Sequence, residues 1–459
     1  MVRDMTAGSP SKILVTFALP MILGNVFQQL YNIVDSVVVG NFVGSDALAA
    51  VGASYPVTFL FIAVATGASI GCSVVISQFY GAKRITEMKS SVFTALTSMM
   101  TLSALLLLAG LLLARPLLLL MRTPGDIFSD ADAYLRIYVA AVPFLFLYNT
   151  STAAFNALGD SRTPLLFLAA ACVLNIGLDF VLILWCSMGV AGAAVATVFS
   201  QLVSGGLCLL YMFRRFPVLR LQRRDWIPER RMLLNESRVG LPMGFQMSII
   251  AIGAMILQIA LNRLGSTAIA GFIAAQKIDQ LANQPMMSFG ITMATYAAQN
   301  YGAGNMRRIR AGVRRCILMS VGFSIVCGGA LILAAKPMAG LFVGADQPEV
   351  LDYVQTYLLL NASLYFLLAL LFIFRYTLQG LGKSLFPTIA GVAELLMRTL
   401  AALVLANIWG YAGVCLSNPI AWFGALIPLT TAYVLTIRRL PDTEGLAAPA
   451  VPEAEPAAD

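Results

Sequence analysis

Long apolar segments separated by short polar stretches constrain the fold of this chain more than any other feature. Crossing the hydrocarbon of a bilayer takes roughly 20 apolar residues in a helix. The 459 residues are 59% hydrophobic and only 11% charged, against roughly 25% charged in soluble domains. Segments this long exclude the shorter strands of a membrane barrel. We therefore predict an all-α polytopic membrane protein with twelve spans, near 13–39, 48–77, 91–114, 134–157, 164–186, 189–212, 239–262, 268–298, 312–335, 352–378, 385–407 and 411–436.

Basic residues are concentrated in alternate loops. Of the 30 lysines and arginines, 22 lie near the two termini or in the loops after even-numbered spans, and five lie in the opposite loops. The positive-inside rule then predicts cytoplasmic termini for a multi-pass protein of the plasma membrane. Topology and anionic lipid headgroups account for the net charge of +8, so we expect no nucleic-acid partner. We expect a monomer whose partners are the lipid bilayer and small organic substrates.

The two halves of the chain repeat each other. Three motif pairs carry the repeat: Leu19-Pro20-Met21 with Leu241-Pro242-Met243, Gln78-x-Tyr80-Gly81-Ala82 with Gln299-x-Tyr301-Gly302-Ala303, and Leu158-Gly159-Asp160-Ser161 with Leu381-Gly382-Lys383-Ser384. Each repeat holds six predicted helices. Because six is even, the two copies share one orientation, and their pseudo-twofold axis lies along the membrane normal.

The repeats and the polar segments between them define the predicted domains. Residues 1–213 form an N-terminal six-helix lobe, and residues 239–438 form a C-terminal six-helix lobe. Between them lies an arginine-rich cytoplasmic linker, 214–238. Residues 439–459 are rich in proline, alanine and acids without periodicity, which is typical of a disordered tail.

An acid inside the first apolar segment marks the first candidate site. Asn25, Gln28, Asn32 and Asp35 are spaced three, four and three residues apart, so a helix carries them on one stripe. A carboxylate within the bilayer is costly, so such an Asp is expected to face the protein interior and to mark an ion or proton pathway. The alternative is an Asp near a helix end that polar neighbours hold for packing specificity.

A second group of polar residues follows on the fifth and sixth predicted helices. Asn175 and Asp179 are four residues apart, and Thr197 is the only hydroxyl within Ala191–Val198. With Asp35 they offer oxygen ligands that suit Na+, while two neighbouring carboxyl groups also suit a proton. Asn175 and Thr197 could instead be interhelical hydrogen-bonding residues. In the second repeat Ile256 or Leu257 occupies the position of Asp35, which favours a specialised site in the first half.

The second half carries its own charges. Lys277 and Asp279 lie on one predicted helix, and Glu394 and Arg398 are four apart on another, where they can pair. We favour a structural role for that pair and keep Asp279 or Glu394 as alternatives for coupling or for binding substrate charge. A polar and flexible set is expected to line the substrate cavity: Gln28, Tyr31, Asn32, Gln276, Gln280, Asn283 and Met287.

Several enzyme classes are excluded by residues that the sequence lacks. The chain has no histidine, which removes histidine-based metal sites and catalytic triads. It has no phosphate-binding G-x-x-x-x-G-K-[ST] motif, so ATP-driven pumping by this chain is not expected. The seven cysteines form no C-x-x-C pair. We expect no enzyme, no cofactor and no metal other than Na+ at Asp35, Asn175, Asp179 and Thr197.

Taken together, these motifs resemble one transporter family. Leu-Pro-Met opens each half, Asp35 lies on the first helix, Gln-x-Tyr-Gly-Ala closes the second and eighth, and Asn175-x-x-x-Asp179 lies on the fifth. The chain resembles the multidrug and toxic compound extrusion (MATE) family, in particular its DinF-like and MepA-like bacterial members. The resemblance implies a V-shaped pair of lobes and export of organic, often cationic, compounds by antiport with Na+ or H+.

The resemblance also bears on individual residues. In the DinF-like branch the first-lobe cation site matches Asp35, Asn175, Asp179 and Thr197. The NorM-like branch has a Glu on the seventh helix where this chain has Gln246, which weakens the case for a second-lobe site of that kind. Two other functions stay open. A flippase for lipid-linked sugars would be expected to have more helices or a more basic cavity, and a membrane enzyme would need a catalytic set.

Overall fold

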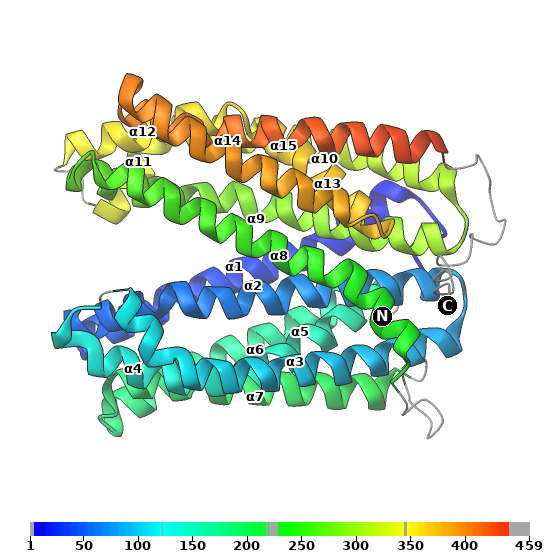
Figure 1. The fold of residues 1–459 in the computed structure, drawn as a ribbon, viewed down its shortest axis with the longest axis horizontal. Coiled ribbons are helices and arrows are strands. Elements are labelled where there is room, and N and C mark those ends of the chain that lie inside the picture. Colours follow the sequence, from blue (N-terminus) through cyan, green and yellow to red (C-terminus); the bar gives the residue numbers. More distant parts are fainter. Residues whose placement is uncertain (1–3, 122, 217–218, 220–227, 344–346, 440–459) are drawn as a thin grey trace, which may run out of the picture. The chain divides into compact units, whose positions relative to one another are not determined.

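The computed structural model describes residues 4–121, 123–216, 219, 228–343 and 347–439, and every regular element within them is a helix (Figure 1). The predicted tail falls almost entirely outside these residues. The first half contains α1 (Pro10–Phe42), α2 (Ser45–Gly81), α3 (Ile85–Leu120), α4 (Gly125–Ala140), α5 (Val142–Ala157), α6 (Arg162–Asp179), the π-helix η1 (Phe180–Trp185) and α7 (Gly189–Arg215). The second contains α8 (Arg230–Asn262), α9 (Ser266–Gly302), α10 (Met306–Leu333), α11 (Ala335–Val343), α12 (Pro348–Ala362), α13 (Tyr365–Gly380), α14 (Leu385–Trp409) and α15 (Tyr411–Arg439).

Ten of the twelve predicted spans match described helices, or bent helix pairs, that are long and apolar enough to cross a membrane. Eight described helices are individually long and apolar enough to cross a membrane, and two bent pairs, α4 with α5 and α12 with α13, each supply another span. The remaining two are α8 and α9, with 33 and 37 residues. At about 1.5 Å per residue both exceed the roughly 30 Å of hydrocarbon. α9 carries several polar side chains along its length, among them Gln276 and Gln280.

Breaks within three spans were not predicted. The span 134–157 bends by 42° between α4 and α5, and the span 352–378 bends by 50° between α12 and α13. Pro143 lies in the first turn of α5, where its missing N–H and its ring prevent α4 from continuing. The predicted span 164–186 is the third with a break: α6 changes into the π-helix η1 immediately after Asp179. A π-helical turn is rare and often accompanies a functional site.

Positive backbone torsions confirm the repeat at the level of structure. Gly159 and Gly382 have φ angles of +78° and +75° after α5 and α13. Gly189 and Gly410 have φ angles of +56° and +55° at the starts of α7 and α15. Glycine adopts this left-handed region without the steric cost that a side chain brings. The duplicated motifs therefore end and begin helices in the same way in both halves.

The chain divides into two compact units, which we describe separately. Unit 1 comprises Leu19–Tyr80 and Arg84–Gly244, together with Asp4. Unit 2 comprises Met5–Ala18, Gly81–Lys83 and the described residues from Phe245 onward. The division falls within α1 and α8, beside Pro20 and Pro242 of the duplicated Leu-Pro-Met motif.

In unit 1 the first turns of α8 attach to α3. The hydroxyl of Ser91 donates to Glu236 at 2.7 Å, and that of Ser90 donates to Glu229 at 2.7 Å. These bonds give partners to the acids that precede the apolar part of α8. The helix consequently begins at Arg230, nine residues before the predicted span and inside the segment 214–238 that we expected to be a linker.

In unit 2 the beginning of the chain is held at the end of α9. Met5 is fully buried, and its backbone N–H donates to the side-chain oxygen of Gln299 at 2.9 Å. The side chain of Asn300 donates to the carbonyl of Met5 at 3.2 Å, and Arg308 donates to the carbonyl of Gly8 at 3.0 Å. These contacts explain why Met5–Ala18 belongs to unit 2.

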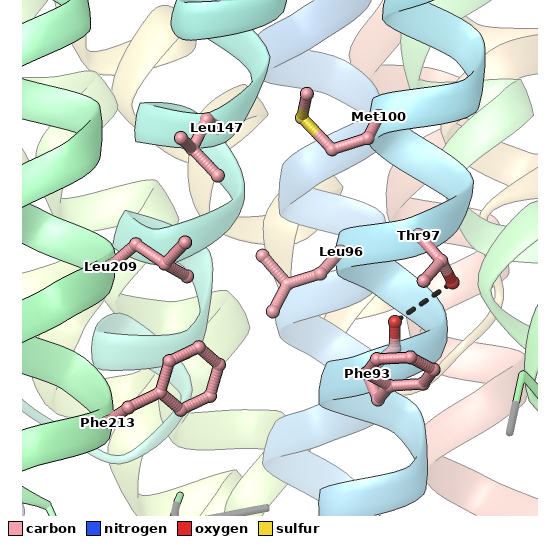
Figure 2. Close-up of a pocket in the computed structure, with 7 residues that line it drawn as sticks. All are labelled: Phe93, Leu96, Thr97, Met100, Leu147, Leu209 and Phe213. Carbon is pink, nitrogen blue, oxygen red and sulfur yellow. Dashed lines mark hydrogen bonds between the residues drawn. The ribbon is translucent and has the colours of Figure 1, made fainter. Parts of the chain in front are cut away.

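A groove runs between α3 and α7 of unit 1, with α5 at its floor (Figure 2). Its volume is about 230 Å³. Seven residues line it: Phe93, Leu96, Thr97, Met100, Leu147, Leu209 and Phe213.

We predict that Gly71→Ala destabilises the protein by about 1 to 3 kcal/mol, because a Cβ at Gly71 would lie 2.3 Å from the Cα of Gly240 in α8. Thermal melting of the purified protein in detergent measures the change. Gly52→Ala is the matched control on α2, since no heavy atom lies within 4 Å of its added Cβ. Equal melting temperatures for the two variants would contradict the close α2 to α8 packing.

Candidate functional site

Unit 1 brings the four predicted cation-coupling residues onto three neighbouring helices. Asp35 lies on α1, Asn175 and Asp179 on α6, and Thr197 on α7. Asp179 and Asn175 are 0% and 1% exposed, and Thr197 is 7% exposed. Asp35 is half-buried. These polar side chains therefore face the protein interior and not the lipid. This is expected, because a charged group exposed to the hydrocarbon of the bilayer costs free energy.

The carboxyl groups of Asp35 and Asp179 are close enough to hydrogen bond with each other. Two carboxylates at this separation repel each other strongly in a low dielectric, so they are stable together only with a cation between them. The Oδ1 atom of Asp35 is buried without a hydrogen-bond partner. The pair therefore has the chemistry to share one proton or to bind one small cation.

Two tyrosines extend this pair. Tyr31 lies one turn before Asp35 on α1, and its hydroxyl lies close to that of Thr197. Thr197 in turn donates to the carbonyl of Ala193 at 3.1 Å. Tyr134 of α4 lies near both carboxyl groups and stacks on Tyr138. We expected Tyr31 in the substrate cavity. It thus lies between the predicted cavity residues of α1 and the predicted cation-coupling residues Asp35 and Thr197.

An apolar cluster borders the carboxyl pair. It contains buried residues from α1, α2, α4, η1 and α7: Val38, Val39, Ala47, Tyr134, Ile183, Val190, Ala193 and Ala194. Electrostatic interactions strengthen where water is excluded. A cation between Asp35 and Asp179 would consequently be bound more tightly here than at a protein surface.

The oxygen-rich donor set fits Na+ or a proton better than a transition metal. Among the described residues no group of three or more His, Cys, Asp or Glu side chains could hold a metal ion. Two carboxyl groups, an amide and hydroxyls are hard ligands of the kind that alkali and alkaline-earth cations prefer.

The predicted cavity residues divide between the two units. Gln28 and Asn32 are exposed on α1 in unit 1, and Gln276 and Gln280 are exposed on α9 in unit 2. Asn283 and Met287 are half-buried on α9. Exposed polar side chains on membrane-spanning helices are consistent with a surface that water or substrate reaches.

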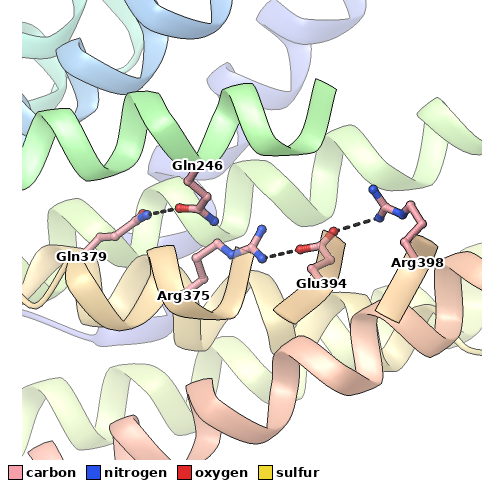
Figure 3. A network of polar contacts seen from close by, with 5 residues as sticks. All are labelled: Gln246, Arg375, Gln379, Glu394 and Arg398. Carbon is pink, nitrogen blue, oxygen red and sulfur yellow. Dashed lines mark hydrogen bonds and ion pairs between the residues drawn. The ribbon is translucent and has the colours of Figure 1, made fainter. Parts of the chain in front are cut away.

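The second-half charges form a buried chain of ionic contacts (Figure 3). The predicted pair forms, with Arg398 donating to Glu394 at 2.9 Å. Arg375 of α13 donates to the other carboxylate oxygen at 2.6 Å. Beside this triad, Gln379 donates to Gln246 at 3.0 Å. Glu394 thus bridges two arginines on two helices.

The remaining second-half charges lie apart from the triad. Asp279 accepts hydrogen bonds from the hydroxyl of Tyr365 and the amide of Asn283, and it is 7% exposed. Lys277 is exposed on α9. Of the four residues grouped in the sequence, only Glu394 and Arg398 share an ion pair.

Sequence reasoning missed Arg375 and Tyr134. Arg375 is the only charged residue in the apolar helix Tyr365–Gly380, and an isolated charge within a span is itself a signal of a partner. Tyr134 carried no such signal, because a tyrosine in an apolar helix is usually a core residue.

Ionisable groups buried inside a bundle of membrane-spanning helices define a membrane transporter, and comparison with known proteins agrees. The sequence profile of the MatE family matches residues 20–181 and 242–404, one match in each repeat. The chain is 30% identical over 387 residues to the "Probable multidrug resistance protein YoeA" of Bacillus subtilis, covering 82% of each chain. It is also 30% identical to the "Probable multidrug resistance protein YpnP" of the same species, covering 83% of this chain and 85% of that protein.

The fold agrees with solved structures as well. An outward-facing multidrug resistance MATE family transporter superposes with a TM-score of 0.90 at 24% identity, over 96% of this chain and 98% of that one. The chain belongs to the MatE family. It is therefore a multi-pass multidrug efflux transporter with the twelve-helix, two-lobe MATE fold and not an enzyme. The predicted fold and the stated resemblance are confirmed.

We predict that Glu394→Gln destabilises the protein by about 3 to 5 kcal/mol, because it leaves two buried arginines without their shared carboxylate. Melting in detergent measures this. Glu349→Gln, at an exposed acid on α12, is the matched control and should change stability by less than about 0.5 kcal/mol. If Glu394→Gln melts normally but fails to transport, Glu394 acts in the mechanism instead.

Proposed function

We propose that this protein exports organic, often cationic, compounds by antiport with Na+ or H+, and that Asp35 and Asp179 bind the coupling ion. The observation that carries the proposal is the proximity of these two buried carboxyl groups, of which Asp35 has an unpartnered oxygen. Asn175 and Thr197 complete the set of oxygen donors. Neither acid has a counterpart in the second repeat, so one half carries the coupling site and the other does not.

The coupling follows from competition. Without a bound cation, the carboxyl pair carries negative charge that attracts an organic cation toward unit 1. Binding of H+ or Na+ neutralises that charge and weakens the attraction. The protein loaded with an organic cation and the protein loaded with H+ or Na+ then favour different conformations, because each ligand binds one conformation more tightly than the other. Such a difference in affinity is the thermodynamic requirement for antiport.

Tyr31 provides the physical link between coupling and substrate. It is one turn from Asp35 and lies close to Thr197, while the nearby Gln28 and Asn32 are exposed on the same helix. A change in charge at Asp35 alters the electrostatic environment of this exposed stripe directly. An aromatic ring beside a carboxylate suits lipophilic cations.

The membrane topology is part of the proposal. The distribution of 22 basic residues on one side against five on the other supports cytoplasmic termini in the plasma membrane. The separate family matches at 20–181 and 242–404 support two lobes, 1–213 and 239–438, joined through the basic segment 214–238. We propose that the protein acts as a monomer.

We predict that Asp35→Asn and Asp179→Asn each abolish gradient-driven transport while the protein stays folded and inserted, because each removes the coupling charge but keeps the side-chain volume. Asn175→Ala should weaken coupling less, since it removes a ligand and not a carboxyl group. The measurement is uptake of ethidium into inverted vesicles under imposed Na+ or pH gradients.

Asp126→Asn, at an exposed acid on α4 of the same unit, is the control and should transport normally. Continued gradient-driven export with Asp35 and Asp179 both replaced would contradict the coupling site. If no organic cation in a varied panel moved, but a polyprenyl diphosphate sugar bound tightly, the function would be that of a flippase.

A further inference from the structure

The groove between α3, α5 and α7 is long enough for part of a lipid acyl chain. Along α3 its lining extends from Phe93 to Met100, which at about 1.5 Å per residue is roughly 10 Å parallel to the helix axis. The volume is about 230 Å³. The lining side chains other than the buried Leu96 are half-buried, so the groove opens sideways from unit 1 (Figure 2).

The groove offers no polar contact to a ligand along this length. Six of its seven side chains are apolar, and the hydroxyl of Thr97 already donates to the carbonyls of Phe93 and Thr94 at 3.0 Å. A cavity lined in this way stays dry and binds apolar molecules. On a membrane-spanning bundle the apolar molecule at hand is the hydrocarbon chain of a lipid.

Basic residues mark one end of the groove. Phe93 and Phe213 line that end, as the close-up shows. Arg214 and Arg215 follow Phe213 in the last turn of α7, and both are exposed. Lys89 lies one turn before Phe93 near the beginning of α3. A headgroup attached to a chain in the groove would thus lie near three basic residues.

We propose that this groove is a binding site for one anionic phospholipid, with an acyl chain between α3 and α7 and its phosphate at Lys89, Arg214 and Arg215. The apolar lining and the basic residues at one end of the groove match a lipid with a hydrocarbon chain and an anionic headgroup. Basic pockets between membrane-spanning helices are favoured sites for anionic headgroups. The bound lipid holds α3 against α7 through contacts that α5 alone does not supply.

The test is lipid binding to the purified full-length protein by native mass spectrometry. The probes are phosphatidylglycerol and phosphatidylcholine with identical acyl chains. We expect retained phosphatidylglycerol at concentrations where phosphatidylcholine is lost. Leu209→Trp, which fills the groove, should remove that retention, while Leu105→Trp on the exposed face of α3 should keep it.

A charge variant tests the site without altering the packed bundle. Replacing Arg214 and Arg215 with Gln should lower the preference for phosphatidylglycerol by about fivefold per arginine. The same change at Arg438 and Arg439, which end α15 in the other repeat, is the matched control and should leave the preference unchanged. Equal retention of both lipids by the wild type, or an unchanged preference in the Arg214 and Arg215 variant, would overturn the proposal.

Discussion

The hydrocarbon of a bilayer supplies no hydrogen-bond partner and no counter-ion, and the structure of this protein follows from that constraint. Its described regular elements are all helices, which satisfy their own backbone groups. Each buried charge must then find a partner within the chain. Glu394 finds two arginines, and Asp279 finds Tyr365 and Asn283. Asp35 and Asp179 lie close to each other, so two groups of like charge share one site.

This difference separates a structural charge cluster from a coupling site. In the triad, opposite charges attract one another at 2.6 and 2.9 Å, and with two arginines against one glutamate the cluster does not attract an external cation. In the carboxyl pair, two negative charges lie side by side and repel each other. Whether a cation or proton binds between them would therefore depend on the ion concentrations on either side of the membrane. The two repeats share one scaffold, and both acids of the carboxyl pair lie in the first of them.

The sequence predicted the parts of the fold that depend on the length of apolar segments and on the internal repeat. Apolar length located the spans, up to ten of which the described helices match by length and composition. The duplicated motifs located the repeat, whose paired glycines adopt matching torsions. It did not predict the bends or the π-helix after Asp179, because these depend on local backbone hydrogen bonds. The bend at Pro143 had a local signal, whereas the bend between α12 and α13 lacks a proline at the break.

The candidate site was predictable to a similar extent. Helical spacing placed Asn175 and Asp179 on one face, and the cost of intramembrane charge turned them inward. The contact of Asp35 with Asp179, and that of Tyr31 with Thr197, join helices far apart in the sequence. No local pattern encodes such a contact. The ion pair of Arg375 could not be predicted for the same reason, because its partner Glu394 lies on the next helix.

The most direct test of the account is to measure the cation that the protein releases when an organic cation binds. Purified protein in weakly buffered detergent solution is titrated with ethidium, and proton or Na+ release is recorded with a pH dye or an ion-selective electrode. The account predicts about one cation released per ethidium bound, and none from a variant with Asn at both 35 and 179, through competition for one site. Equal release from both proteins, or binding to the wild type without release, would contradict it.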